Sequence, residues 1–82
     1  VMEGLKQTIG NENIIIPDKP ATGAEDFSFF NKHVPCTFMW LGCKSDINEN
    51  CCVIHNPNFI CDERAIPVGI KALCGVAMEF LK

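Results

Sequence analysis

One long apolar stretch, from Glu63 to Leu81, constrains the fold of this chain more than any other feature. Its apolar side chains recur at the spacing of an α-helix, with Asp62 placed to cap that helix and Pro67 inside its first turn. The main apolar face consists of Ile66, Ile70, Leu73, Cys74, Ala77, Phe80 and Leu81. A second face carries mostly small residues, namely Ala65, Val68, Gly69, Ala72, Gly75 and Val76.

A helix with so few polar residues must be covered on most of its sides. The small residues of the second face would let it lie close against a β-sheet. At 1.5 Å per residue, about 19 residues give a helix of roughly 28 Å, the thickness of a domain larger than this chain. Composition agrees, because 48% of the 82 residues are hydrophobic, too many for the small core that a chain of this length forms. We therefore expect the chain to be one part of a larger folded unit.

The segments before this helix have the composition of an alternating helix and strand pattern. Residues 1–9 show helical spacing and end at Gly10, a residue typical of helix C-termini. Ile14–Ile16 is a β-branched run closed by Pro17, and Cys36–Cys43 is a continuous apolar run typical of a buried central strand. The predicted fold class is α/β, a segment of a three-layer α/β domain with a short helix, a strand, a short helix, a buried strand and the long C-terminal helix.

A short helix is predicted after Thr22, because Thr22 or Gly23 can cap it and two acidic residues, Glu25 and Asp26, fall in its first turn. One interpretation of this segment is purely structural. The other is that Thr22, Gly23 and Ala24 leave backbone N–H groups open to a substrate carboxylate or an oxyanion. In that case Glu25 and Asp26 must turn away from the anion or accept hydrogen bonds behind the site. The sequence leaves both interpretations open.

Six cysteines in a short chain are compatible with a disulfide framework. Disulfide scaffolds, however, compensate for a poor core, whereas this chain is rich in apolar residues and places Cys36, Cys43 and Cys74 inside apolar runs. We therefore predict free thiols and a reducing compartment. A small Cys/His zinc module is an alternative that lacks a Cys-x2-Cys pair. Its ligands would be Cys43, Cys51, Cys52, His55 and Cys61.

Charge and hydropathy narrow the classes of partner. A net charge of −3 and a pI of about 5.2 argue against nucleic acid and against an anionic membrane surface as partners. No stretch approaches the roughly 18–20 uncharged apolar residues of a transmembrane helix. Residues 1–10 lack the pattern of a secretory signal. We therefore predict a cytoplasmic protein with no nucleic-acid and no membrane partner.

The segment before the long helix carries the strongest candidate for chemistry. A strand-like apolar entry leads to His55, and Pro57 stiffens the backbone directly after the imidazole. A ligand or catalytic histidine needs such a stiff support. A single histidine in a loop is also commonly a surface or hydrogen-bonded structural residue, so the residues alone leave both roles open. His33 is expected to be an exposed histidine at the end of the short helix.

Several short motifs occur in an order that is similar to that of a known enzyme family. They are Gly23-Ala24-Glu25-Asp26-Phe27, Val34-Pro35, Leu41-Gly42, His55-Asn56-Pro57-Asn58-Phe59, Asp62-Glu63 and Ile66-Pro67-Val68-Gly69. From about Ile14 to Leu81, they resemble the C-terminal segment of metal-dependent N-acyl-amino-acid amidohydrolases. This family includes hippurate hydrolases and auxin-conjugate hydrolases, within the aminoacylase and carboxypeptidase-type metallopeptidases.

The resemblance implies that residues 1–82 are the C-terminal part of a metallohydrolase catalytic domain, with the N-terminal part and an inserted dimerisation domain absent. The implied partners are the rest of its own catalytic domain and a second subunit, in a homodimer formed through the absent domain. His55 matches the family's late metal-ligand histidine. The earlier ligands, in Cys-x-His or His-x-Asp motifs, and a Glu-Glu pair with the general base have no counterpart here. The isolated chain is therefore expected to be inactive.

The implied reaction is hydrolysis of the amide bond of N-acyl amino acids or small peptides by a metal-activated water. The implied cofactor is a divalent metal, Zn, Mn or Co, with two ions in the complete active site. Such ions lower the pKa of a bound water and polarise the carbonyl, and a neutral imidazole supplies one ligand. Residues 48–52 depart from the usual small and glycine-rich loop of the family. Two alternatives stay open: an inactive remnant that binds a ligand or partner, and the Cys/His zinc module.

Overall fold

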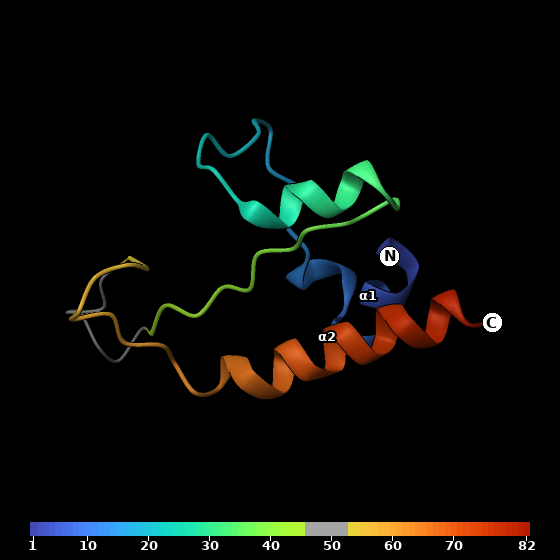
Figure 1. Ribbon diagram of the computed structural model, residues 1–82. Helices are drawn as coiled ribbons and strands as arrows, with labels where there is room; N and C mark the ends of the chain where they lie inside the picture. Colours follow the sequence, from blue (N-terminus) through green and yellow to red (C-terminus); the bar gives the residue numbers. More distant parts are fainter. Residues whose placement is uncertain (46–52) are drawn as a thin grey trace.

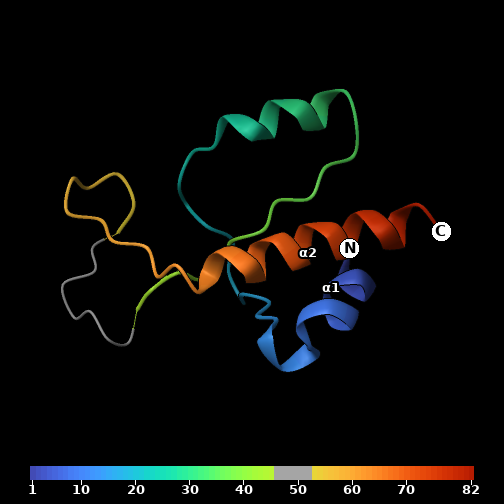
Figure 2. The same ribbon diagram turned by 90° about the horizontal axis from the view of Figure 1, so that it is seen from below.

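The computed structural model describes residues 1–45 and 53–82 of the chain. Within these ranges the chain forms the α-helices α1 (Met2–Ile9) and α2 (Ala65–Phe80) and the 3-10 helices η1 (Asn11–Asn13) and η2 (Asp26–Lys32). Figure 1 shows α1 against the C-terminal half of α2, with both chain termini at that end of the molecule. Helix η2 and the segments on either side of it lie on another side of α2, as the second view also shows (Figure 2).

The predicted α/β fold class is wrong, because residues 1–45 and 53–82 contain no β-strand. In the first predicted strand, Ile15 and Ile16 are 88% and 73% exposed. The second, Cys36–Cys43, is irregular backbone in which Trp40 is 67% exposed. A strand is stable only where its N–H and C=O groups pair with a neighbouring strand. Neither apolar run has such a neighbour in the described part of the chain, although the Asp62 N–H donates one hydrogen bond to the Cys43 carbonyl, at 2.9 Å.

The N-terminal helix matches the prediction closely. Helix α1 ends at Gly10, whose φ of 84° lies in the region that L residues with a side chain rarely adopt. The Gly10 N–H donates to the Lys6 carbonyl at 3.2 Å, which closes the last turn. The predicted helix end at Gly10 is therefore confirmed.

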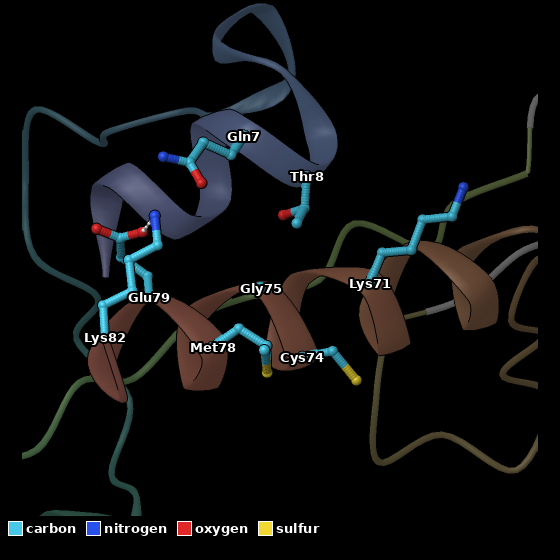
Figure 3. A pocket seen from close by; sticks show the side chains of 8 residues that line it. All are labelled: Gln7, Thr8, Lys71, Cys74, Gly75, Met78, Glu79 and Lys82. Atoms are coloured by element: carbon cyan, nitrogen blue, oxygen red, sulfur yellow. Dashed lines mark ion pairs between the residues drawn. The ribbon is translucent and has the colours of Figure 1, made fainter.

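Helices α1 and α2 meet at two facing glycines. A methyl group added at Gly4 would lie 2.6 Å from the carbonyl oxygen of Gly75, and one added at Gly75 would collide with the Thr8 side chain. Figure 3 shows Thr8 of α1 facing Gly75 of α2. Leu5 and Ala65 are the buried apolar side chains of the described ranges. The small face of α2 thus allows the predicted close approach, but its neighbour is a helix and not a sheet.

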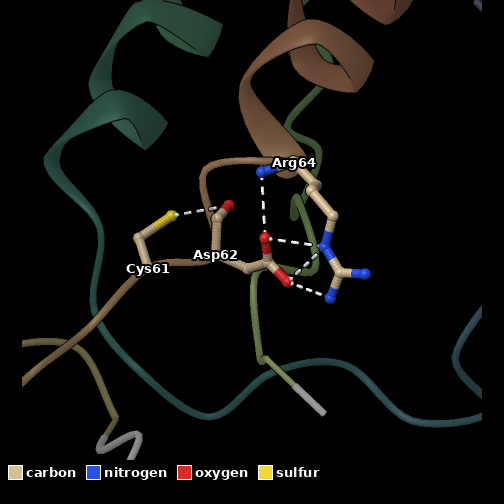
Figure 4. Close-up of polar contacts among 3 residues, drawn as sticks. All are labelled: Cys61, Asp62 and Arg64. Atoms are coloured by element: carbon tan, nitrogen blue, oxygen red, sulfur yellow. Dashed lines mark hydrogen bonds and ion pairs between the residues drawn. The ribbon is translucent and has the colours of Figure 1, made fainter. Parts of the chain in front are cut away.

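Helix α2 has 16 residues, slightly fewer than the sequence predicts, and Pro67 lies in its first turn as expected. Arg64 occupies the N-cap position, and Asp62 closes the turn just before it. The Asp62 carboxylate accepts the Arg64 N–H at 2.9 Å (Figure 4). The Asp62 carbonyl also accepts the Ala65 N–H, at 2.9 Å. The prediction of Asp62 as the N-cap is therefore wrong, because Arg64 holds that position, but the Asp62 carboxylate orders the turn that leads into the helix. The main apolar face of α2 is exposed, including Leu73 at 64%.

The short helix η2 begins later than predicted. Its cap is Glu25, whose carboxylate accepts the Phe27 N–H at 3.2 Å, so the expectation that Thr22 or Gly23 caps this helix is wrong. The glutamate satisfies one of the free N–H groups of the first turn, that of Phe27, and residues 22–24 lie outside the helix. Phe27 and Phe30 lie on one face of η2, with their ring centroids 5.5 Å apart. The Phe27 ring also contacts Phe38, with centroids 5.6 Å apart.

Three further expectations can be compared with the described residues. His33 is the exposed C-cap of η2, as predicted. Cys36, Cys43, Cys61 and Cys74 take part in no disulfide. Cys51 and Cys52 lie outside the described residues, so reduced thiols at all six positions stay a prediction. None of the described helices has the length and apolar character needed to cross a lipid bilayer.

Candidate functional site

His55 lies in an exposed loop, residues 53–60, that precedes α2. Figures 1 and 2 both place this loop beyond the N-terminal end of α2, away from α1. His55 has a φ of 66° and is the one residue other than glycine with a positive φ in the described ranges. This left-handed conformation costs an L residue roughly 1–2 kcal/mol. Residues held in it cluster at functional sites, so the backbone singles out His55 independently of the sequence pattern.

A turn formed by residues 56–59, with Pro57 and Asn58 at its centre, follows His55 directly. The Phe59 N–H donates to the Asn56 carbonyl at 2.9 Å, and the Asn58 N–H donates to the Asn56 side-chain oxygen at 2.8 Å. Pro57 has a fixed φ and no N–H to satisfy. The stiff turn that the sequence predicts after the histidine is therefore present, and both of its hydrogen bonds end on Asn56.

Asp62 and Arg64 form an ion pair just before the first turn of α2. The Arg64 Nε lies 3.0 and 2.9 Å from the two carboxylate oxygens of Asp62, and the Cys61 thiol donates to the Asp62 carbonyl at 3.6 Å (Figure 4). The hydrogen bonds from Arg64 hold the pKa of the Asp62 carboxyl below its ordinary value of 3.8. Asp62 is therefore a charged group engaged in ordering the helix start.

The other predicted site residues lie on the segment before η2. Thr22, Gly23 and Ala24 are exposed and irregular, and a side chain added at Gly23 would meet open space. Glu25 caps η2 and Asp26 is its first residue. No hydrogen bond or ion pair connects these residues with the His55 loop in the part of the chain that the structure describes. The roles assigned to them from the sequence stay predictions.

The donor atoms of the described residues fit a metal site only in part. His55 offers an exposed imidazole that has no hydrogen bond or ion pair with any other described residue. Residues 1–45 and 53–82 contain no group of three or more His, Cys, Asp or Glu side chains that could hold a metal ion. Cys43, Cys61 and His55 of the alternative zinc module therefore form no such group, and Cys51 and Cys52 lie outside the described residues. His55 can supply one ligand to a site whose remaining ligands come from elsewhere.

An open groove of about 400 Å³ lies between α1 and the C-terminal half of α2 (Figure 3). Its wall includes Cys74 and Met78, and its rim carries Lys82, whose ammonium pairs with the Glu79 carboxylate at 2.9 Å. This pairing raises the pKa of Lys82 above its ordinary value. The sequence gives no sign of this groove beyond the small residues of α2. Among the described residues, no hydrogen bond joins the Cys74 thiol in its lining to an acidic or basic side chain.

Comparison with known proteins resolves the question of family. The model of peptidase family M20/M25/M40 matches residues 1–79 of the chain. The chain belongs to this family. The resemblance stated from the sequence motifs is thereby confirmed, and the M20/M25/M40 peptidases are hydrolases that are generally metal-dependent.

Individual relatives carry related names. An IAA-amino acid hydrolase ILR1-like 6 of Arabidopsis thaliana is 34% identical over 72% of this chain and 13% of its own length. A putative amidohydrolase YhaA of Bacillus subtilis is 31% identical over 95% of this chain and 18% of its own length. A hippurate hydrolase of Campylobacter jejuni is 25% identical over 98% of this chain and 20% of its own length. No solved structure matches the chain.

The matches cover most of this chain but only a small part of each relative. The M20/M25/M40 peptidase match extends over nearly all of this chain, whereas the chain spans 13% to 20% of the length of the three relatives. The family is therefore established for the chain, and the activity of a whole protein that contains it is a matter of proposal.

Proposed function

We propose that this chain is part of a metal-dependent amidohydrolase that cleaves the amide bond of N-acyl amino acids or small peptides with a metal-activated water. The observation that carries the proposal is the family match over residues 1–79. The strained and exposed His55, held next to a closed turn, supports it from the structure.

His55 is proposed as a metal ligand. Its imidazole is exposed and free of hydrogen bonds to other described residues, and neutral imidazole is a common ligand of divalent metals. The left-handed backbone fixes the direction in which the side chain leaves the loop. Catalytic zinc sites use three protein ligands, so the complete site needs ligands and a general base from outside the described residues.

The bound metal, proposed as a pair of Zn, Mn or Co ions, supplies Lewis acidity toward the amide carbonyl and acidifies a bound water. The residues of this chain contribute orientation to that site. His55 holds one coordination position, and the turn after it fixes the loop. Thr22, Gly23 and Ala24, which are exposed and outside η2, are proposed to bind the substrate carboxylate or oxyanion through backbone N–H groups. Glu25 and Asp26 are proposed to support this segment, as the cap and the first residue of η2.

The surface of the chain supports its proposed place in a larger catalytic domain. The accessible surface is 7309 Å² for 9.1 kDa, whereas a compact monomer of this mass exposes about 4,900 Å². The radius of gyration is 14.5 Å, compared with about 12 Å for a compact domain of this length. The excess surface includes the main apolar face of α2. We therefore propose that the chain is the C-terminal part of the catalytic domain and that the rest of this domain covers the exposed apolar face. We further propose that the complete protein is a cytoplasmic homodimer formed through another domain.

The substrate class is inferred from the relatives. Hippurate and IAA-amino acids both join an acyl group to an amino acid through an amide bond, and these words occur in the names of two relatives. An N-acyl amino acid offers a scissile amide to the metal and a carboxylate to a cluster of N–H groups. Residues 22–24 are the proposed partners of that carboxylate.

The test is an activity assay on the complete protein that contains these residues and, separately, on the chain of 82 residues. Hippurate and N-acetyl amino acids serve as probes, and released amino acid is measured. We expect the complete protein to turn over at least one probe, to lose activity in a chelator and to regain it with Zn, Mn or Co. The short chain should be inactive, since it has one proposed ligand. A complete protein without chelator-sensitive turnover would contradict the proposal and leave an inactive binding remnant.

A further inference from the structure

The loop that carries His55 contains a left-handed residue without a buried anchor beside it. Residues 53–58 are all exposed, and Phe59 is only half-buried. A non-glycine residue keeps a positive φ only where its surroundings enforce it. Packing cannot enforce it here, because the side chains on both sides of His55 are exposed. The constraint must come from hydrogen bonds or from the covalent geometry of the loop.

Both hydrogen bonds within residues 53–60 end on Asn56. Its side-chain oxygen accepts the Asn58 N–H at 2.8 Å, and its carbonyl oxygen accepts the Phe59 N–H at 2.9 Å. The side-chain bond closes a ring over Pro57, whose φ is fixed. Replacing the Asn56 amide by a side chain without an acceptor removes the shorter of the two bonds and releases the residue that follows His55 directly.

We propose that Asn56 is a positioning residue for His55. Its side-chain oxygen fixes the turn that keeps the His55 backbone left-handed, and this backbone conformation directs the imidazole toward the metal. This inference rests on the proposed role of His55 as a ligand. Asn56 itself donates no atom to the metal and takes no part in the reaction. The turn restricts the loop before the metal binds, so less conformational entropy is lost on binding and the metal affinity is higher. Residues that orient a metal ligand commonly raise metal affinity.

The sequence of the same loop supplies a matched control. Asn58 takes part in the turn through its backbone N–H, and its side chain has no hydrogen bond with the described residues. Asn58→Ala therefore keeps the turn, whereas Asn56→Ala removes one of its two bonds. Asn56→Asp keeps an acceptor oxygen at the same place and is the conservative rescue.

The experiment measures metal affinity in the complete protein by competition with a chromophoric chelator, with Zn²⁺ as the probe, for His55→Ala, Asn56→Ala, Asn56→Asp and Asn58→Ala. We expect Asn56→Ala to lose about 10-fold to 100-fold in affinity, the range typical of residues that orient a ligand. Asn56→Asp and Asn58→Ala should stay within about threefold of the unchanged protein. Thermal unfolding of the metal-free proteins, recorded in parallel, separates a positioning effect from a general loss of structure.

The outcomes distinguish the two proposals. Unchanged affinity in His55→Ala would remove the ligand assignment and the role of Asn56 together. Loss of affinity in His55→Ala with unchanged affinity in Asn56→Ala would overturn the role of Asn56 alone. Equal losses in Asn56→Ala and Asn58→Ala, or no rescue by Asn56→Asp, would also overturn it, because a loss that does not follow the acceptor oxygen is not the one proposed.

Discussion

The α1–α2 crossing and the His55 loop are ordered by opposite means. At the crossing, Gly4 and Gly75 bring two helix backbones so close that neither position has space for a methyl group. In the loop, the side chains around His55 are exposed, and order comes from a proline and two hydrogen bonds to Asn56. Close packing of two helix backbones orders the first region, and two hydrogen bonds and a proline order the second.

This difference separates stability from chemistry along the chain. Substitutions at the crossing should act on folding, because close-packed backbones cannot move apart without losing contacts along both helices. Substitutions in the loop should act on metal binding and leave folding nearly unchanged, because an exposed loop contributes little to the core. The following predictions test each side of that division.

The largest effect on stability is expected for Gly75→Ala. The added methyl would collide with the Thr8 side chain and lie 2.9 Å from the carbonyl oxygen of Gly4, so the helices must separate. We expect a loss of about 1–3 kcal/mol in the free energy of unfolding, measured by urea denaturation. Gly69→Ala is the matched control in the same helix, since its methyl would meet only the flexible end of Leu41. Gain of helix propensity should make that variant neutral or up to about 1 kcal/mol more stable.

Gly10→Ala should have a smaller effect. The φ of 84° at Gly10 is unfavourable for alanine, and the helix end must rearrange or remain strained. We expect a loss of about 1–2 kcal/mol in the same assay. Gly23→Ala provides the comparison, because the added methyl meets nothing within 4 Å and no positive φ is required there. Equal losses in the two variants would show that backbone conformation is not the cause at Gly10.

The smallest effect is a change in the pH dependence of stability. Because hydrogen bonds from Arg64 lower the pKa of Asp62 in the folded state, the stabilisation is complete above the unfolded-state pKa, near 3.8, and is lost as the pH falls through the lower folded-state pKa. Asp62→Asn should therefore flatten the fall of the melting temperature below about pH 4. Asp18→Asn, which removes a carboxylate outside this turn, should not. An unchanged slope in Asp62→Asn would show that the pairing with Arg64 does not contribute to stability.

The sequence predicts those features that depend on neighbouring residues. The helical spacing of residues 1–9, the glycine at position 10 and the apolar periodicity of α2 each act over one or two turns, and each is confirmed. The turn after His55 is predicted for the same reason, since Pro57 acts on its direct neighbours. The N-cap of α2 is Arg64 and not the predicted Asp62, although the Asp62 carboxylate accepts the Arg64 N–H in the turn before the helix.

The strands could not be predicted in the same way. The apolar character of Ile14–Ile16 and Cys36–Cys43 indicates residues suited to burial, but a strand also requires a partner backbone, which no local pattern reveals. The sequence favours Thr22 or Gly23 as the cap of η2 because such residues are common caps, whereas the Glu25 carboxylate accepts the Phe27 N–H in the first turn. The left-handed backbone of His55 has no signal in the sequence beyond the tolerance of histidine for that region.

The most direct measurement of the central claim compares His55→Ala and His33→Ala in the complete protein, recording bound metal, kcat and melting temperature. Both histidines are exposed, but only His55 is proposed as a ligand. The account predicts that His55→Ala loses bound metal and nearly all turnover with little change in melting temperature, and that His33→Ala is unchanged in all three. Full metal occupancy and near-normal kcat in His55→Ala would contradict the assignment.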